Sequence, residues 1–189
     1  MNEFELKYML TKHQFRCLRE FIENYFKYQF ERTKQVNYYY DTDDQYYFKK
    51  DSTVRIREKN GVLLGTVKMH SLDTPYQSEE IPFEIERVPL RLSYQGRVLK
   101  FMGGLITYRH MIPITKETTL FLDENRYLGK VDYELEIEFG EDSFIEAWKT
   151  AVLMTTVLGR CYDPNQCFKP SISKSKRFFK CLRKNAGGA

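Results

Sequence analysis

The chain has 189 residues, of which 30% are charged and 15% aromatic, and its formal net charge is +4 at pH 7. This length suits a single domain, and so small an excess of positive charge does not indicate binding of nucleic acid through bulk charge. The sequence contains no signal peptide and no long apolar run, so we expect a soluble, cytoplasmic protein without a membrane attachment.

The first predicted element is a strand at 3–8, in which charged and apolar residues alternate. Because successive side chains of a strand point to opposite faces, Glu3, Glu5 and Lys7 share one face. Taken alone, this alternation is typical of an edge strand with a solvated charged face. The alternation recurs, however, with three carboxylates in 133–139 and with two guanidinium groups in 54–57. The recurrence indicates a charged interior that holds a ligand.

Strands of opposite charge suit one kind of ligand. Clustered carboxylates repel one another, and removing each from water into the protein interior costs roughly several kcal/mol of free energy. A hard divalent cation such as Mg²⁺ or Mn²⁺ removes the repulsion, and magnesium is usually held by a few carboxylates together with substrate phosphates. Arginine and lysine side chains on facing strands then suit the phosphate oxygens. The sequence therefore predicts a polyphosphate ligand with its metal ion.

The opening Glu-x-Glu-x-Lys of residues 3–7, in agreement with the later strands, resembles the signature of the CYTH superfamily, the triphosphate tunnel metalloenzymes. The resemblance extends from Glu3 to about Arg177. It implies an α+β fold, an eight-stranded antiparallel β-barrel that forms a tunnel, with flanking α-helices. Family members include inorganic triphosphatases, thiamine triphosphatases, class IV adenylate cyclases and RNA triphosphatases. We expect one CYTH-like domain at 1–180 and a flexible tail at 181–189.

After the first strand, Thr11 and Gln14 form a predicted capping box. Apolar residues then recur at helical spacing, which predicts a helix to about residue 28 that serves only core packing. A second strand is predicted at 36–41, and it ends in an acidic turn that contains Asp41 and Asp43. Both acids could bind a metal ion, but turn chemistry explains them better.

Two strands, at 53–59 and 62–69, are predicted to form a hairpin around Asn60-Gly61, the strongest sequence signal for a type I′ turn. The hairpin carries Arg55, Arg57 and Lys68. A solvated basic patch is the alternative interpretation, but the hairpin matches the family pattern, which implies contacts with phosphate.

The region at 77–102 is less regular. Pro82 cannot donate to a strand ladder, so we expect the strand at 77–86 to lie at an edge or to be bulged. Glu80, near an acidic position of the family, is expected to orient basic side chains. Residues 89–102 are predicted to form a second helix, with Gly103-Gly104 as its stop.

Three further strands are predicted, at 105–114, at 118–123 and, after a turn at 124–129, at about 130–139. Arg109 stands where the family usually has Lys-x-Arg, and one basic residue is therefore missing. In the resemblance, Asp123, Glu136 and Glu138 join the two acids of the first strand as the metal ligands. Asp132 and Glu134 share their face and are expected nearer the mouth of the tunnel.

The last predicted helix begins with a capping box, Ser143 and Glu146, and ends at Gly159. The family places one lysine from the basic segment after it in the tunnel, for which Lys174 is the first choice and Lys176 the second. The four cysteines show no C-x-x-C spacing and no paired histidines, so we expect free thiols; they are Cys17, Cys161, Cys167 and Cys181.

The resemblance implies a divalent-metal-dependent hydrolase that acts on a small triphosphate-containing molecule, such as tripolyphosphate, thiamine triphosphate or ATP, with no nucleic-acid partner. No Ser, Cys or His nucleophile is needed. The implied residues are Glu3, Glu5, Lys7 and Arg57 for catalysis, Lys7, Arg55, Arg57, Lys68, Arg109 and Lys174 for phosphate, and Glu3, Glu5, Asp123, Glu136 and Glu138 for Mg²⁺ or Mn²⁺. Two alternatives remain, cyclisation of ATP at the same site and a non-catalytic module that binds polyphosphate or nucleotide. The many carboxylates argue against the second.

Overall fold

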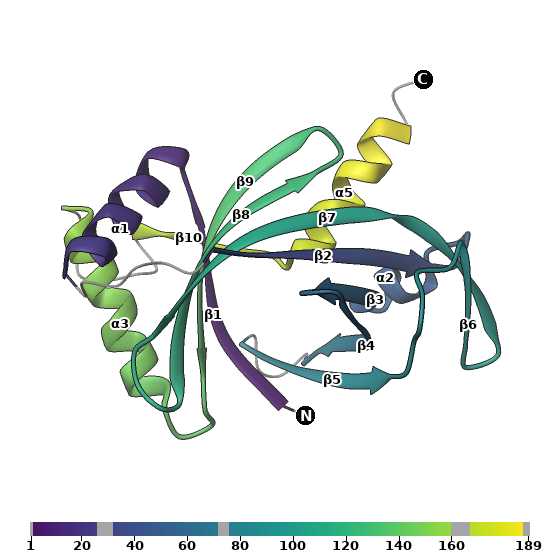
Figure 1. The fold of residues 1–189 in the computed structure, drawn as a ribbon, viewed down its shortest axis with the longest axis horizontal. Helices are drawn as coiled ribbons and strands as arrows, with labels where there is room; N and C mark the ends of the chain where they lie inside the picture. The colour runs from purple at the N-terminus through teal and green to yellow at the C-terminus, as the bar shows by residue number, and fades with distance from the viewer. Residues whose placement is uncertain (1, 26–31, 72–75, 160–166, 187–189) are drawn as a thin grey trace.

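The computed structural model describes residues 2–25, 32–71, 76–159 and 167–186. Eight antiparallel strands close into a barrel, as the sequence predicts, in the order β1-β5-β4-β3-β2-β7-β8-β9, with β9 returning to β1 (Figure 1). The strands of the barrel are β1 (Asn2–Leu10), β2 (Arg32–Asp41), β3 (Ser52–Lys59), β4 (Val62–His70), β5 (Gln77–Phe83), β7 (Arg97–Pro113), β8 (Thr118–Tyr127) and β9 (Lys130–Phe139).

The barrel closes unevenly along β1. One edge of β1 pairs with β9 over 4–10, whereas the other edge pairs with β5 only over 2–4 and with the short β10 (Lys169–Pro170) only at Tyr8 and Met9. Between these two pairings, the backbone N–H of Glu5 donates to the carbonyl of Tyr76 at 2.9 Å, and the N–H of Ser171 donates to the carbonyl of Lys7 at 3.0 Å. The wall is therefore thinnest beside residues 5–7.

Two helices, α1 (Lys12–Tyr25) and α3 (Phe144–Val157), cover one side of the barrel (Figure 1). The predicted capping box of α1 is confirmed, because the backbone N–H of Thr11 donates to Gln14 at 2.8 Å and that of Gln14 to Thr11 at 3.1 Å. The predicted box of α3 is wrong. The hydroxyl of Ser143 donates to Glu117 at 2.9 Å instead of capping the helix, because that carboxylate lies within its reach.

The helix predicted at 89–102 is also wrong. These residues form a hairpin of β6 (Arg91–Tyr94) with the start of β7. Gln95 and Gly96 both have positive φ, 47° and 72°, which is the conformation of a type I′ turn. Leu92 and Leu99 pair across the hairpin and are both buried. The predicted turn at Asn60-Gly61 is confirmed, because both residues also have positive φ, 52° and 77°.

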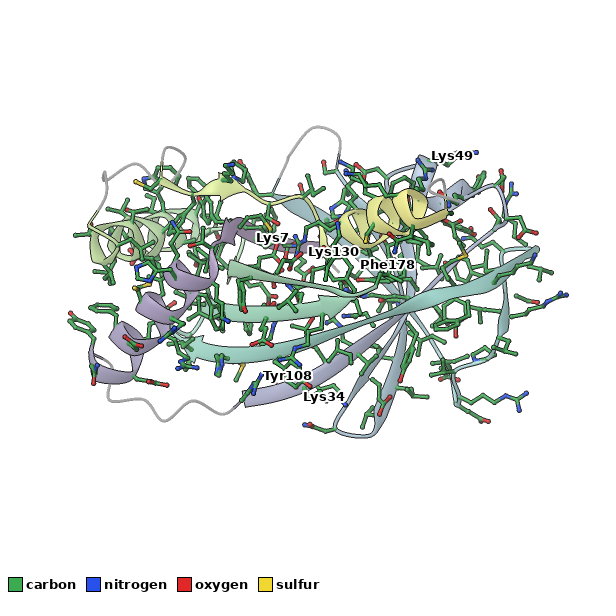
Figure 2. The ribbon with its side chains drawn as sticks, turned by 90° about the horizontal axis from the view of Figure 1, so that it is seen from above. Lys7, Lys34, Lys49, Tyr108, Lys130 and Phe178 are labelled. Atoms are coloured by element: carbon green, nitrogen blue, oxygen red, sulfur yellow. The ribbon has the colours of Figure 1, made fainter. Side chains whose placement is uncertain are left out.

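The helix α5 (Lys174–Ala186) packs against the strands through two aromatic side chains, and Phe178 points from it toward the barrel (Figure 2). The ring of Phe178 lies 4.9 Å from that of Tyr39, between ring centroids. Gly103 permits this approach, since a Cβ at that position would lie 2.8 Å from the Phe178 ring. Cys181 is buried and α5 continues to Ala186, so residues 181–186 belong to this helix and not to the predicted tail.

The acidic turn after β2 caps the short helix α2 (Tyr46–Lys49). The carboxylate of Asp41 accepts hydrogen bonds from the backbone N–H groups of Tyr47 and Phe48, each at 3.0 Å. This confirms the interpretation of Asp41 as a turn residue. β8 continues to Tyr127, so the turn predicted at 124–129 is confined to the positive-φ residues Leu128 and Gly129.

Two further expectations concern the state of the cysteines and the absence of a membrane attachment. Cys17 and Cys181 are free thiols, as predicted, but Cys167 is disulfide-bonded, so the prediction of free thiols is wrong for this residue; Cys161 lies outside the described residues. The absence of a C-x-x-C motif argues against a metal site, but it does not bear on pairing at other spacings. Among the described helices, none is long and apolar enough to cross a membrane.

Candidate active site

The inward faces of the strands and the start of α5 enclose a cavity, which we call the tunnel cavity. Lys7 lies near the centre of the molecule, among the strands (Figure 2). Ten of the eleven residues that the sequence analysis selected line this cavity: Glu3, Glu5, Lys7, Arg55, Arg57, Lys68, Arg109, Glu136, Glu138 and Lys174. The eleventh, Asp123, is fully buried behind Arg109. The alternation along each strand thus brings the predicted residues together.

The carboxylates of the cavity fall into two groups rather than the one cluster that was predicted. Glu3, Glu5 and Glu138 form the outer carboxylates, which have ligand atoms within 4.8 Å of one another. Glu3 and Glu138 remain about a third exposed, at 31% and 32%. The ammonium group of Lys68 lies between Glu3 and Glu5, at 3.0 Å from the latter, and Lys7 lies 2.5 Å from Glu5.

Glu138 is the least compensated of these acids. Its nearest cation is the guanidinium of Arg109, at 3.6 Å. Burial, together with the neighbouring charges of Glu136, Glu3 and Glu5, raises the pKa of Glu138 to about 7 despite the opposing effect of Arg109. Burial and like charge are the two causes that make a carboxylate bind a proton or a cation more readily. Among the outer carboxylates, Glu138 is therefore the one that the surrounding side chains neutralise least, whereas Lys68, against the effect of burial, lowers the pKa of Glu3.

The inner carboxylates, Asp123, Glu134 and Glu136, are almost fully buried, and side chains of the protein neutralise them. The guanidinium of Arg109 donates twice to Asp123, at 2.9 and 2.7 Å, and also contacts Glu136. Burial opposes the charge of Arg109, but these carboxylates raise its pKa well above the ordinary value. Such a bidentate arrangement fixes the orientation of the guanidinium group.

Lys174 completes the neutralisation from the first turn of α5. Its ammonium group lies 2.9 Å from Asp123, 2.8 Å from Glu134 and 2.5 Å from Glu136. Lys176, the second choice for the tunnel, instead pairs with Asp51 at 2.7 Å. Of these two lysines, Lys174 is thus the one that lines the tunnel cavity.

Two residues of the inner network were missed by the sequence analysis. Glu134, expected near the mouth, has no exposed surface, so that expectation is wrong. Arg177 donates to Glu134 at 2.9 Å and to Asp132 at 2.9 Å. Although burial opposes it, Lys174 and Arg177 lower the pKa of Glu134 to about 2. The alternation along β9 could have included Glu134 with its neighbours, but no local signal pairs it with an arginine 43 residues away.

Arg57 has too little neutralisation in the opposite sense to Glu138, because it is a buried cation without a carboxylate partner among the described residues. Its Nε donates to the side-chain oxygen of Asn37 at 3.0 Å, and its guanidinium forms no salt bridge among the described residues. Burial and the nearby charges of Arg55 and Arg109 lower the pKa of Arg57 to about 10. Arg55 differs, because Glu80 accepts from it at 2.7 Å, as expected for an acid that orients a basic side chain. The tunnel cavity thus contains an under-neutralised cation as well as an under-neutralised acid.

His70 lies at the edge of the cavity, at the end of β4. Burial, together with the charges of Lys68 and Lys7, lowers its pKa to about 4. The imidazole is therefore neutral at pH 7. Its Nε2 is buried and has no hydrogen-bond partner among the described residues.

Comparisons with known proteins agree on one family. The family model described as the CYTH domain matches residues 1–156. The Bacillus subtilis protein YjbK, which bears the provisional name of a triphosphatase, is 32% identical over 149 residues that cover 72% of this chain and 76% of YjbK.

Solved structures are similar over nearly the whole chain. A Bacillus halodurans protein with the provisional name of an adenylate cyclase has a TM-score of 0.68 and 24% identity, covering 94% of this chain and 97% of its own. HpAC1 from Hippeastrum, also provisionally named an adenylyl cyclase and described as having a dominant triphosphatase activity, has a TM-score of 0.67 and 19% identity, covering 97% and 96%. At these identities the two structures bear on the fold, and they agree with the closed eight-stranded barrel.

Proposed function

This chain belongs to the CYTH family, and we propose that it is a divalent-metal-dependent triphosphatase that hydrolyses a triphosphate held in the tunnel cavity. One observation carries the proposal, the opposite imbalance of charge at two places in the same cavity. Glu138 has its nearest cation among the described residues, Arg109, at 3.6 Å, and Arg57 forms no salt bridge among them; burial and like charges raise the pKa of the first and lower that of the second. A bound cation relieves the first imbalance and a bound anion relieves the second. A metal–polyphosphate complex supplies both.

The outer carboxylates fit a hard divalent ion. Glu3, Glu5 and Glu138 offer three carboxylate oxygens within 4.8 Å of one another, and Mg²⁺ and Mn²⁺ prefer such ligands. When bound, the ion lowers the pKa of a coordinated water and neutralises phosphate oxygens. Asp123 and Glu136, which the resemblance assigned to the metal set, are already neutralised by Arg109 and Lys174. We assign these two acids the task of holding the cations in place.

The cations of the cavity bind and orient the phosphate chain. Arg57 can make a bidentate contact with phosphate oxygens at no cost in broken ion pairs, since its hydrogen-bond partner among the described residues is the neutral Asn37. Lys7, Arg55 and Lys68 lie around the same cavity and add positive charge where negative charge develops on the transferred phosphoryl group. Water forms a bond to the terminal phosphorus as the bond to the bridging oxygen breaks, which yields diphosphate, phosphate and a proton.

Product analysis tests this function. The protein is incubated with tripolyphosphate, ATP and thiamine triphosphate, each with Mg²⁺ or Mn²⁺, and the products are separated by anion-exchange chromatography. The proposal expects phosphate release, with diphosphate or the organic diphosphate as the second product. Formation of cyclic AMP and diphosphate from ATP would identify a cyclase instead. Binding of all three compounds without turnover would identify a non-catalytic module.

A further inference from the structure

The wall of the barrel contains a second cavity beside residues 5–7, where β1 lies between its pairings with β5 and β10. We call it the seam pocket; its volume is about 500 Å³, which falls within the range of roughly 300–1,000 Å³ of small-molecule sites. Four residues, Glu5, Lys7, His70 and Ser173, line both the seam pocket and the tunnel cavity. The two cavities therefore adjoin through the thinnest part of the wall.

The seam pocket differs chemically from the tunnel cavity. Among the described residues, ten of the sixteen that line the tunnel cavity are Asp, Glu, Lys or Arg, against four of the thirteen that line the seam pocket. Tyr76 and Ile172 contribute apolar surface to the seam pocket and are 37% and 42% exposed. The pocket also includes Leu6, Tyr8 and Pro170. Such a lining suits an organic ring, whereas the tunnel cavity suits phosphates.

Polar groups in the seam pocket can orient such a ring. The neutral imidazole of His70 has a buried Nε2 without a hydrogen-bond partner among the described residues, and it lies where the two cavities adjoin. A buried polar atom without a partner is unfavourable, so a ligand group that pairs with it gains affinity. The Asp51–Lys176 pair, at 2.7 Å, provides charged groups elsewhere on the same pocket.

We propose that the seam pocket binds the organic group of a triphosphate whose phosphates lie in the tunnel cavity. The preferred substrate class is then a triphosphate that bears a heterocyclic organic group, rather than inorganic tripolyphosphate. This inference rests on the proposed function for the placement of the phosphates. It explains why a cavity with a half-apolar lining adjoins a cavity that is lined mainly by charged groups.

A pocket-filling substitution tests the inference. Ile172→Trp adds bulk to the seam pocket, and Ile145→Trp is the matched control, because Ile145 is 67% exposed on α3 and lines neither cavity. The readout is kcat/KM for tripolyphosphate, ATP and thiamine triphosphate. In the parent, at least one organic triphosphate should exceed tripolyphosphate by roughly tenfold or more, the scale of one well-made apolar contact. Ile172→Trp should lower that ratio by a similar factor, and Ile145→Trp should leave it unchanged.

Other results would overturn the inference. A parent enzyme that prefers tripolyphosphate, or an Ile172→Trp enzyme with an unchanged ratio, would show that the organic group lies elsewhere. If Ile172→Trp does not fold, Tyr76→Ala removes a ring from the same pocket and should lower the same ratio. If the parent hydrolyses none of the compounds, the proposed function fails, and calorimetric binding of the β,γ-imido analogue of ATP decides the pocket separately. Weaker binding by Ile172→Trp than by the parent would support the pocket, and equal binding would overturn it.

Discussion

Replacement of Arg57 by alanine removes the one cation for which the proposed function predicts the largest loss of phosphate binding. The guanidinium has Asn37 as its hydrogen-bond partner at 3.0 Å, and its pKa is lowered to about 10 by burial, Arg55 and Arg109. A hydrogen bond to a charged group contributes about 1.5–3 kcal/mol. Since about 1.4 kcal/mol corresponds to tenfold in rate, we expect kcat/KM for the preferred triphosphate to fall by roughly ten- to a hundredfold.

Steady-state kinetics at low and moderate salt measure this loss. Arg57→Lys should recover only part of it, because an ammonium group cannot copy the bidentate geometry of a guanidinium. Arg126→Ala is the matched control, since this arginine is 53% exposed on β8 and pairs with Glu124 outside the tunnel cavity. The control should stay within about twofold of the parent, because exposed ion pairs contribute only about 0–1 kcal/mol.

The free protein offers a second readout for the same variant. Because Arg57 is a buried cation without a carboxylate partner among the described residues, its removal should leave the melting temperature of the ligand-free protein unchanged or raise it. An Arg57→Ala enzyme within about twofold of the parent at both salt concentrations would refute the reasoning and place this side chain outside the phosphate site.

Three further predictions follow from the site. Glu138→Gln should lose metal-dependent turnover while the metal-free protein melts at the same or a higher temperature, because it removes one of several repelling charges; Glu5→Gln should also lose turnover but melt at a lower temperature, because Lys7 and Lys68 each lose a carboxylate partner. A large fall in melting temperature for Glu138→Gln with turnover intact would show that this acid is structural. Arg177→Met should lower the melting temperature by several degrees, because it leaves the buried Glu134 without one partner and breaking a buried ion pair costs about 3–5 kcal/mol; calorimetry showing no change would contradict this. The folded-state pKa of His70, about 4, is below its ordinary 6.5, so the unfolded chain binds the proton more readily and stability is lost as the pH falls from about 6.5 toward about 4; urea titrations at about pH 7.5 and 5 should show a smaller loss for His70→Gln than for the parent, and equal losses would contradict the assignment.

The barrel and most of its inward face could be predicted because both depend on local alternation. Because alternate side chains of a strand share one face, Glu3, Glu5 and Lys7 all line the same cavity. The hairpin turn at Asn60-Gly61 was equally local, since positive φ at both positions favours this pair of residues. Where the pattern had period two and a defined turn, the sequence predicted the structure.

The prediction of a helix at 89–102 was wrong because the same spacing of apolar residues fits both a helix and a hairpin. Leu92 and Leu99 are seven residues apart, a spacing that places them on one face of a helix and that also places them opposite each other in a hairpin. The two-residue turn at Gln95-Gly96 decides between the patterns, and it is a weaker sequence signal than Asn-Gly. The spacing of the apolar residues alone therefore could not distinguish the hairpin from a helix.

The division of the carboxylates into outer and inner groups could not be predicted from the strands alone. All lie on inward faces, and their difference depends on which cations reach them. Arg109 comes from β7 and Lys174 from α5, so the neutralisation of Asp123 and Glu136 is fixed by contacts between residues distant in the chain. Those contacts leave Glu138 as the acid with the greatest need for a cation.

The measurement that tests the central claim most directly is phosphate release by metal-stripped protein as Mg²⁺ or Mn²⁺ is restored, with the preferred triphosphate as substrate. We predict no turnover in EDTA, recovery of the parent when the metal is added, and little or no recovery of Glu138→Gln at the same metal concentration. Undiminished turnover after complete removal of metal would contradict it, and so would equal recovery of the parent and the variant.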